Sequence, residues 1–304
     1  MSSDRLLVSV SDLSDADIAW IERATAAYSG GAATPAAPSC VVGLLFMTSS
    51  LRTHLGFAVA TARLGGTPID VRELRWGPGM SMAETFEDTL RTMSGMVDVV
   101  VARTPFRLDR DVVERCCGSA FVNAGDADGE HPSQALIDLC AITAERGDVG
   151  GLRVGISGDL TSRCARSLVA LLDRRLPLEL ALFAPPGRND LGVAVGPELS
   201  ERISWRKPGD VEDLDVLYLT GLAEGQGDTW VDAGTRAEYA VTRSVLDLLP
   251  ADAVVLSPMP VVDEIAPDAW RDPRVRVFEQ SDRGAHVRTA LLARLLRDDR
   301  GGLT

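Results

Sequence analysis

The chain has 304 residues, of which 45% are hydrophobic and 25% charged, and its formal net charge is −13. This acidic balance argues against nucleic acid or an anionic membrane as the main partner, although a local basic pocket can still bind an anionic small molecule. The length suggests two domains.

No apolar run approaches the length of a membrane span, and the first ten residues lack the apolar core of a signal peptide. The cysteines are odd in number and follow no metal-binding spacing. We therefore expect a cytoplasmic protein without a metal or another cofactor, whose thiols are reduced and mostly buried: Cys40, Cys116, Cys117, Cys140 and Cys164.

In the first half of the chain, a turn-rich segment at 27–39 is expected to be a loop, and apolar runs then alternate with helix-like segments. Strands are predicted at 40–47, 67–71, 97–103 and 121–125, and helices at 54–66, 83–96, 110–120 and 132–147. In the second half, strands are predicted at 152–159, 178–185, 213–221 and 252–260, and helices at 162–174 and 285–298.

Strands that alternate with helices indicate parallel α/β sheets, and two series of similar size indicate two doubly wound, Rossmann-like domains. The boundary is expected near 145–151, which gives a first domain of residues 1–147 and a second of 148–284. In open parallel sheets, ligands bind at the carboxyl ends of the strands. Three motifs follow such strand ends.

The first motif, FMTSSLRTH (46–54), places Ser49, Ser50, Arg52 and Thr53 between a buried strand and the start of a helix. Free backbone N–H groups at a helix start bind anions, and hydroxyl and guanidinium groups add donors that match phosphate oxygens. These residues are predicted to cradle a phosphate. The structural alternative is a serine that caps the helix beside an exposed arginine.

The second motif, VVVARTP (99–105), puts Arg103 at the carboxyl end of a buried strand, where it either faces a ligand or extends into solvent. In the third, GEHPSQ (129–134), His131 and Gln134 flank the start of a helix. Both can donate hydrogen bonds to a carbonyl oxygen, or His131 can serve as a capping residue. Together the motifs suit a small molecule that carries both a phosphate and a carbonyl group.

At this point the chain resembles the aspartate and ornithine carbamoyltransferases. SLRTH (50–54) resembles the family's Ser-Thr-Arg-Thr-Arg phosphate loop, and HPSQ (131–134) matches its His-Pro-(Thr/Ser)-Gln motif, with NAGD before it and ALIDL after it. ETFEDTLRTMSGMVDVVVAR ends in the family's carbonyl-binding arginine, and GDLTSRCARSL, SPMPVVDEI and the closing FEQSDRGAHVRTALLARLL also match in order. The resemblance runs from about residue 40 to residue 297.

The resemblance implies a first domain that binds carbamoyl phosphate, a second that binds an amine acceptor, and a terminal helix (285–304) that packs back on the first. It also implies a homotrimer with shared active sites. Arg52, Thr53, Arg103, His131 and Gln134 would be catalytic, and the donor site would comprise Ser49, Ser50, Leu51, Arg52, Thr53, Arg103, His131, Gln134, Met259 and Pro260. Acceptor-binding positions would be Arg163, Gly221, Ala223 and Met259, with Ser81 and Met82 supplied by a neighbouring subunit.

Several of these positions depart from the family pattern. The loop lysine of the aspartate enzymes is replaced by Met82, and the segment 73–90 contains no lysine. Gly221 and Ala223 stand where those enzymes carry Arg-x-Gln, whose arginine binds the acceptor's side-chain carboxylate. Ser257 replaces the histidine of His-Pro-Leu-Pro, and the ornithine-type Ser-Met-Gly stretch is absent.

The main prediction is therefore a carbamoyltransferase of specialised metabolism whose amine acceptor is neither plain aspartate nor ornithine. One alternative is an authentic aspartate carbamoyltransferase of pyrimidine synthesis with an unusual acceptor pocket. Another is a non-catalytic family member with a structural or regulatory role. An unrelated nucleotide-binding enzyme is disfavoured because GISGD (155–159) lacks the Gly-x-Gly-x-x-Gly spacing.

Overall fold

The computed structural model describes residues 5–71, 84–222 and 231–297. Its internal contacts divide the chain into two compact units, Met1–Ser133 with Arg283–Thr304, and Gln134–Asp282. The predicted positions Ser81, Met82 and Ala223 lie outside the described residues. No helix in the described part of the chain is long and apolar enough to cross a bilayer.

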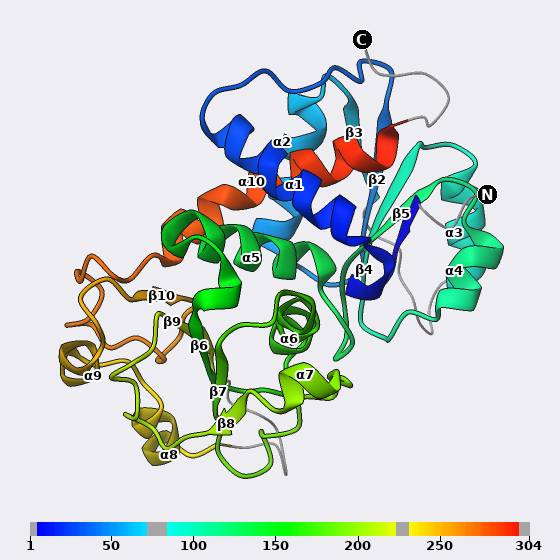
Figure 1. Cartoon of the computed structure of the whole chain (residues 1–304). Helices are drawn as coiled ribbons and strands as arrows, with labels where there is room; N and C mark the ends of the chain where they lie inside the picture. Colours follow the sequence, from blue (N-terminus) through cyan, green and yellow to red (C-terminus); the bar gives the residue numbers. More distant parts are fainter. Residues whose placement is uncertain (1–4, 72–83, 223–230, 298–304) are drawn as a thin grey trace. The chain divides into compact units, whose positions relative to one another are not determined.

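A five-stranded parallel sheet with the order β1-β5-β4-β2-β3 forms the centre of the first unit (Figure 1). Its strands in chain order are β1 (Leu6–Leu7), β2 (Val41–Phe46), β3 (Thr67–Val71), β4 (Val99–Thr104) and β5 (Ala120–Asp126). The central strands β2, β4 and β5 are continuous apolar runs because parallel strands are covered on both faces. Phe46 of β2 lies opposite Arg103 of β4, so the carboxyl ends of these strands are neighbours.

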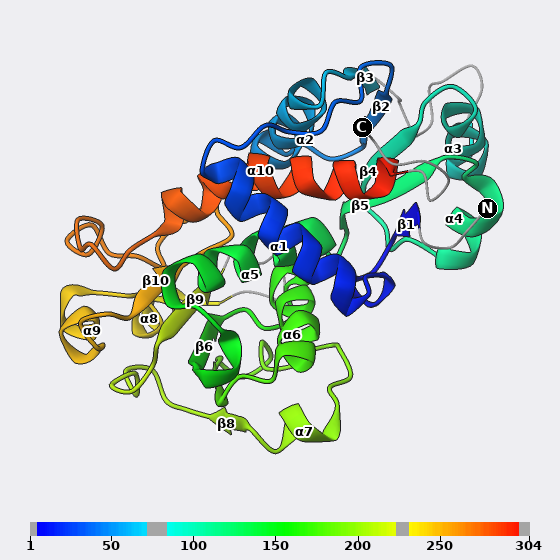
Figure 2. The same ribbon diagram turned by 45° about the horizontal axis from the view of Figure 1, so that its top comes forward.

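The helices of the first unit are η2 (Val10–Asp12), α1 (Asp15–Ser29), α2 (Leu51–Arg63), α3 (Phe86–Ser94), α4 (Arg110–Cys116) and most of α10 (Val277–Leu296). Helix α1 was not predicted, although Ser14 and Asp17 form a capping box at its start. The terminal helix α10 runs beside α1 and α2 (Figure 2). Arg294 of α10 donates to Asp17 at 2.5 Å, and Arg288 lies over the Phe57 ring at 5.4 Å.

Gly56 of α2 lies in close contact with Arg288 of α10. A Cβ atom there would lie 2.6 Å from Nη1 of Arg288, which is buried. Only glycine leaves room for the guanidinium at this contact. The packing of the terminal helix on the first unit, which the sequence predicted, thus depends on one small residue of α2.

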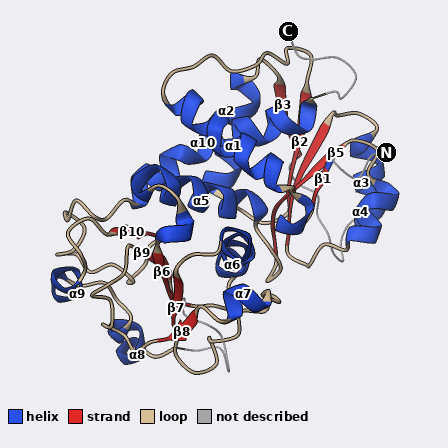
Figure 3. Ribbon diagram, viewed as in Figure 1, coloured by secondary structure: helices blue, strands red, loops and turns tan. Residues whose placement is uncertain are grey.

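The second unit contains a parallel sheet with the order β10-β9-β6-β7-β8 (Figure 3). Its strands are β6 (Arg153–Gly158), β7 (Glu179–Phe183), β8 (Ile203–Trp205), β9 (Val216–Thr220) and β10 (Val254–Leu256). Its helices are α5 (Pro132–Arg146), η3 (Val149–Gly151), α6 (Arg163–Arg175), α7 (Pro197–Ser200), α8 (Ala233–Glu238) and α9 (Arg243–Leu248). The predicted α/β class with two parallel sheets is confirmed. The short elements β8, α7, α8 and α9 were not predicted.

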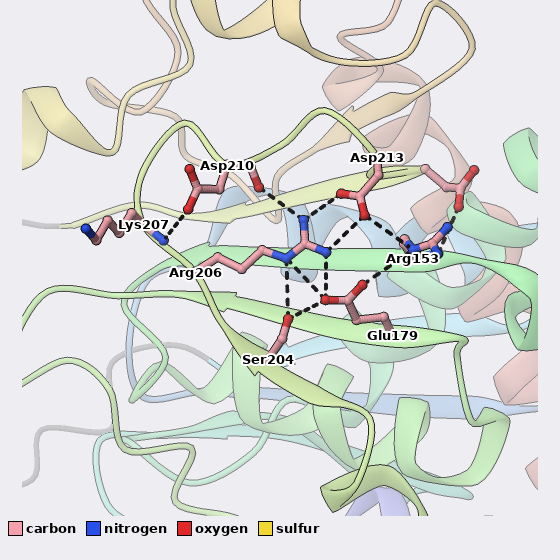
Figure 4. Close-up of polar contacts among 8 residues, drawn as sticks. Arg153, Glu179, Ser204, Arg206, Lys207, Asp210 and Asp213 are labelled. Carbon is pink, nitrogen blue, oxygen red and sulfur yellow. Dashed lines mark hydrogen bonds and ion pairs between the residues drawn. The ribbon is translucent and has the colours of Figure 1, made fainter.

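An ion-pair network ties β6, β7 and the segment after β8 together (Figure 4). Arg206 donates to Glu179 and to Asp213, at 2.6 Å in each case, and Arg153 lies 3.4 Å from both carboxylates. Arg206 donates hydrogen bonds to the Asp213 carboxylate, and this stabilisation of the charged form lowers the pKa of Asp213. All of these charges are satisfied by one another, so the network is a structural brace of the sheet edge.

Candidate functional site

Arg103 is held between the carboxyl ends of three neighbouring strands. It is half-buried on β4, and its Nε donates to Oγ1 of Thr48, just beyond β2, at 3.1 Å. Its Nη1 donates to the carbonyl oxygen of Ala124 on β5, also at 3.1 Å. These bonds fix the guanidinium over the sheet end and argue against an arginine that extends into solvent. The role of Thr48 was missed, because only the fold brings it next to Arg103.

The start of α2 presents backbone donors that no side chain caps among the described residues. Ser50 is the N-cap residue, yet its side chain makes no capping hydrogen bond. The first backbone N–H groups of α2 are therefore left for another acceptor, as an anion site requires. Arg52 is half-buried in the first turn and forms no ion pair with any described residue. Ser49 is exposed, and the Leu51 side chain is 77% exposed.

His54, which replaces the second arginine of the phosphate loop, is turned to a different partner. Its Nε2 lies 3.0 Å from Oδ1 of Asp70 on β3, and its ring packs edge-on against Phe46. An imidazole held in this way supplies no donor to the helix start. The cationic side chain that this loop offers to an anion is therefore that of Arg52.

His131 is buried at the end of the loop that follows β5. Its Nε2 lies 3.4 Å from Oγ1 of Thr53 on α2, and its Nδ1 lies 3.4 Å from Oγ of Ser133. Both contacts are long for hydrogen bonds. The structure brings His131 and Thr53 together, as a shared carbonyl site would require.

The loop before His131 is rigidly braced. Asp126 accepts hydrogen bonds from the backbone N–H groups of Leu108 and Glu130, at 2.8 and 2.7 Å. Glu130 in turn accepts from Ser9 and Val10, and burial raises the pKa of its carboxyl. A Cβ at Gly129 would lie 2.5 Å from Asp126, so the loop closes only with glycine there. This bracing sets the position of the imidazole.

Gln134 belongs to the second unit, where it joins a buried network centred on Asp138. The Asp138 side chain is fully buried and accepts from Gln134 at 2.8 Å, from Gln280 at 2.6 Å and from the Tyr218 hydroxyl at 2.7 Å. Gln280 accepts from the backbone N–H of Ser257 at 2.9 Å. A single carboxylate therefore positions Gln134 and, through Gln280, the SPMP segment. Sequence reasoning identified Gln134 but missed Asp138, Gln280 and Tyr218.

The SPMP segment follows β10 at the carboxyl end of the second sheet. Met259 has a positive φ of 56°, and its N–H donates to Oγ of Ser257 at 3.3 Å. The Met259 side chain is half-buried and packs on the core of the second unit, whereas Pro260 is exposed. Ser257 therefore shapes the turn from within the segment.

Two further predicted residues lie at strand ends in the second unit. Arg163 is the first residue of α6, which Ser162 caps by accepting from the N–H of Ala165. Gly221 directly follows β9, and a Cβ there would lie 2.8 Å from Oε1 of Glu264. Glu264 was not predicted as a site residue. Its only sequence signal is the VDEI stretch after SPMP.

Among the described residues, no group of three or more histidine, cysteine, aspartate or glutamate side chains could hold a metal ion. The two units thus each present a set of polar groups at strand ends. The first offers hydroxyl, guanidinium and imidazole donors. The second offers an amide, a turn with an inward hydroxyl, Arg163 and a carboxylate.

Residues 5–144 match the family described as aspartate/ornithine carbamoyltransferase, carbamoyl-P binding domain, and residues 150–295 match the Asp/Orn binding domain of the same family. The chain belongs to the aspartate/ornithine carbamoyltransferase family. The residues that carry the resemblance in the sequence, from the phosphate loop to HPSQ, fall within these matched ranges.

Relatives in this family carry the name aspartate carbamoyltransferase. The catalytic subunit from Thermoplasma acidophilum is 31% identical over 293 residues, which cover 94% of this chain and 93% of the relative. The chloroplastic enzyme from Oryza sativa is 33% identical over 269 residues, or 84% of this chain and 72% of that protein. The catalytic subunit from Methanosphaerula palustris is 35% identical over 263 residues, with 84% and 87% covered.

A solved structure of the family has the same fold. Aspartate transcarbamoylase from Trypanosoma cruzi, in complex with carbamoyl phosphate, superposes with a TM-score of 0.85 at 27% identity, covering 97% of this chain and 96% of that one. These comparisons confirm the family. They do not confirm the prediction that the acceptor differs from aspartate, and they favour the alternative of an aspartate carbamoyltransferase.

Proposed function

We propose that this protein transfers the carbamoyl group of carbamoyl phosphate to the amine of an amino acid. The observation that carries the proposal is Arg103, fixed by Thr48 and Ala124 at the sheet end beside an uncapped start of α2. An anion-binding helix start and a fixed guanidinium in one unit suit a donor that has both a phosphate and a carbonyl. Family membership supports the same donor.

In the proposed reaction the acceptor nitrogen attacks the carbamoyl carbon, and the carbonyl oxygen takes up negative charge. Arg103, His131 and Thr53 donate to that oxygen, which stabilises the charge as it develops. The bond between the carbamoyl carbon and the phosphate oxygen then breaks. The phosphate leaves with the electron pair toward Ser50, Arg52 and the N–H groups of α2, and one of its oxygens takes the proton that the nitrogen loses. Catalysis is mainly positioning and electrostatics.

Aspartate is the first acceptor to test, because relatives that share about a third of the sequence are named for it. A different acceptor is favoured by one observation, the glycine and carboxylate at Gly221 and Glu264. Arg163, at the start of α6, would bind the α-carboxylate, which aspartate and any other amino-acid acceptor have in common. The homotrimer with shared sites, the cytoplasmic location and a place in specialised metabolism stay predictions.

Calorimetry with carbamoyl phosphate tests the proposal directly. The wild-type protein should bind the donor, and Arg52→Ala should weaken binding by about 100-fold, because one charge-assisted contact to phosphate is worth roughly 1.5–3 kcal/mol. A surface variant such as Arg243→Ala, whose side chain pairs with Asp247 on α9, is the matched control and should bind normally. A folded wild type without affinity for the donor would leave the non-catalytic alternative.

A further inference from the structure

Glu264 lies in the SPMPVVDEI stretch that resembles the family, beside Gly221, which stands where the aspartate enzymes carry an arginine. The residue is buried, with 7% of its surface exposed, and it faces the end of β9. Its Oε2 accepts from the backbone N–H groups of Val262 and Asp263, at 2.8 and 3.1 Å. These bonds fix the carboxylate and leave Oε1 directed at the Cα of Gly221.

No described residue neutralises this carboxylate. The neighbouring Asp263 is paired with Arg236 at 2.7 Å, but Glu264 forms no ion pair within the described chain, and its Oε1 has no hydrogen-bonding partner there. A buried carboxylate without a cation is unfavourable unless a ligand supplies one. Asp263 therefore has an arginine partner, whereas Glu264, the next residue in the sequence, has none among the described residues.

Gly221 lets the carboxylate of Glu264 lie against the backbone at the end of β9. A Cβ atom at this position would lie 2.8 Å from Oε1 and 3.0 Å from the Cδ of Glu264, closer than Cβ contacts occur. The backbone φ of Gly221 is not in the left-handed region, so conformational freedom does not require the glycine. The requirement is steric: any side chain would displace the carboxylate or cover it.

The pair lies where an acceptor is expected. Gly221 directly follows β9, at the carboxyl end of a parallel sheet, which is the ligand side in such folds. The matched family range that contains both residues is the Asp/Orn binding domain. The SPMP segment that precedes Glu264 is fixed to Asp138 through Gln280, so Glu264 is presented by a braced loop.

We propose that Glu264 is a specificity-determining residue that selects an acceptor whose side chain ends in a cationic N–H group, such as an ammonium group. The inference rests on the proposed carbamoyl transfer and deepens it. An ammonium group beside Oε1 gains a charge-assisted hydrogen bond in a site of low dielectric. A carboxylate in the same place meets a like charge at short range, which disfavours aspartate.

The test compares kcat/KM for L-aspartate, L-asparagine, L-2,3-diaminopropionate and L-2,4-diaminobutyrate at saturating carbamoyl phosphate. These acceptors are similar in length and differ in side-chain charge. The diamino acids should exceed aspartate and asparagine by at least about tenfold, the discrimination that one charge-assisted contact provides. Preference for aspartate, or equal use of asparagine and the diamino acids, would overturn the proposal.

Two variants locate the effect. Glu264→Gln keeps the shape and should reduce the preference for the diamino acids about tenfold, with an unchanged Kd for carbamoyl phosphate. Gly221→Ala should act in the same direction by displacing the carboxylate. Asp263→Asn is the matched control and should leave the ranking of acceptors as in the wild type.

If Glu264→Gln does not fold, the ranking of acceptors by the wild type decides the question. An unchanged ranking in a folded Glu264→Gln variant also overturns the inference. Failure of the broader function gives a different result, because the wild type would then not bind carbamoyl phosphate and would use no acceptor. Donor binding with aspartate as the best acceptor refutes only the role of Glu264.

Discussion

The strand ends of the two units present opposite chemistry. In the first, Arg103 and His131 are held as donors beside an uncapped helix start, and the loop before His131 is braced by Asp126. In the second, the strand end at Gly221 faces the carboxylate of Glu264. The first unit therefore keeps most of the polar residues of the family's donor motifs. The second unit keeps the glutamate of the matching SPMPVVDEI stretch but has Gly221 where the aspartate enzymes carry an arginine. The contrast makes the acceptor side the place to test the proposed difference from the relatives that are named aspartate carbamoyltransferase.

The largest effect should come from the donor side. His131→Ala removes a donor to the developing oxyanion and should lower kcat by about 100-fold or more, the usual cost of losing one such donor. The Kd for carbamoyl phosphate should change much less. Steady-state kinetics and calorimetry measure the two quantities, and thermal unfolding checks that the variant is folded. Turnover like that of the wild type would remove His131 from the mechanism.

A second change tests how much the buried hydrogen-bond network around Asp138 stabilises the second unit. Asp138→Asn places an amide where Gln134, Gln280 and Tyr218 all donate, so at least one donor loses its acceptor. We expect the free energy of unfolding, from urea denaturation, to fall by about 2–3 kcal/mol. Tyr218→Phe removes only one of these hydrogen bonds and should cost about 1 kcal/mol. Equal losses in both variants would contradict the central place of Asp138.

The smallest expected effect is a change in the pH dependence of stability. Arg274 hydrogen-bonds to Asp272 of the second unit at 2.8 Å and lowers the pKa of that carboxyl to about 2. Because the folded pKa lies below the ordinary value of 3.8, the stabilisation is present above pH 3.8 and is lost as the pH falls toward 2. Asp272→Asn should therefore lower stability at pH 7 by at most about 2 kcal/mol and flatten the pH dependence between pH 4 and 2.

In the first unit, Glu130 has the opposite shift, since burial raises its pKa. Its contribution is present at low pH and declines as the pH rises through the folded pKa. Acid unfolding followed by circular dichroism distinguishes the two residues. If Asp272→Asn leaves the acid-unfolding curve unchanged, the pair of Asp272 with Arg274 does not contribute to the stability of the second unit.

Much of the fold was predictable because its strongest signals are local. The central strands are short apolar runs bounded by turn residues, and the long helices carry apolar periodicity. Helix α1 was missed because its apolar residues are mostly small alanines that give a weak pattern. The strand β8 and the helices α8 and α9 are too short for periodicity to identify them.

The candidate site likewise contains residues with a local sequence signal and residues that only the fold brings together. Arg103 could be identified because it lies at the carboxyl end of an apolar strand, and His131 because it lies just before the helix that follows such a strand. The bond between Tyr218 and Asp138 joins residues that are 80 positions apart, and no local pattern indicates it. The contact of Glu264 with Gly221 likewise depends on how β9 and the SPMP segment pack. The missing arginine at Gly221 and the glutamate of SPMPVVDEI were both visible in the sequence, but their proximity was visible only in the fold.

The terminal helix has a consequence for the order in which the chain is made. The first unit consists of Met1–Ser133 and Arg283–Thr304, so its packing includes Arg288 and Leu291, which the ribosome adds after the whole second unit. The second unit, Gln134–Asp282, is continuous and is synthesised before α10 is complete. During translation the second unit can therefore fold first, whereas the first unit can complete its packing only after α10 has been synthesised.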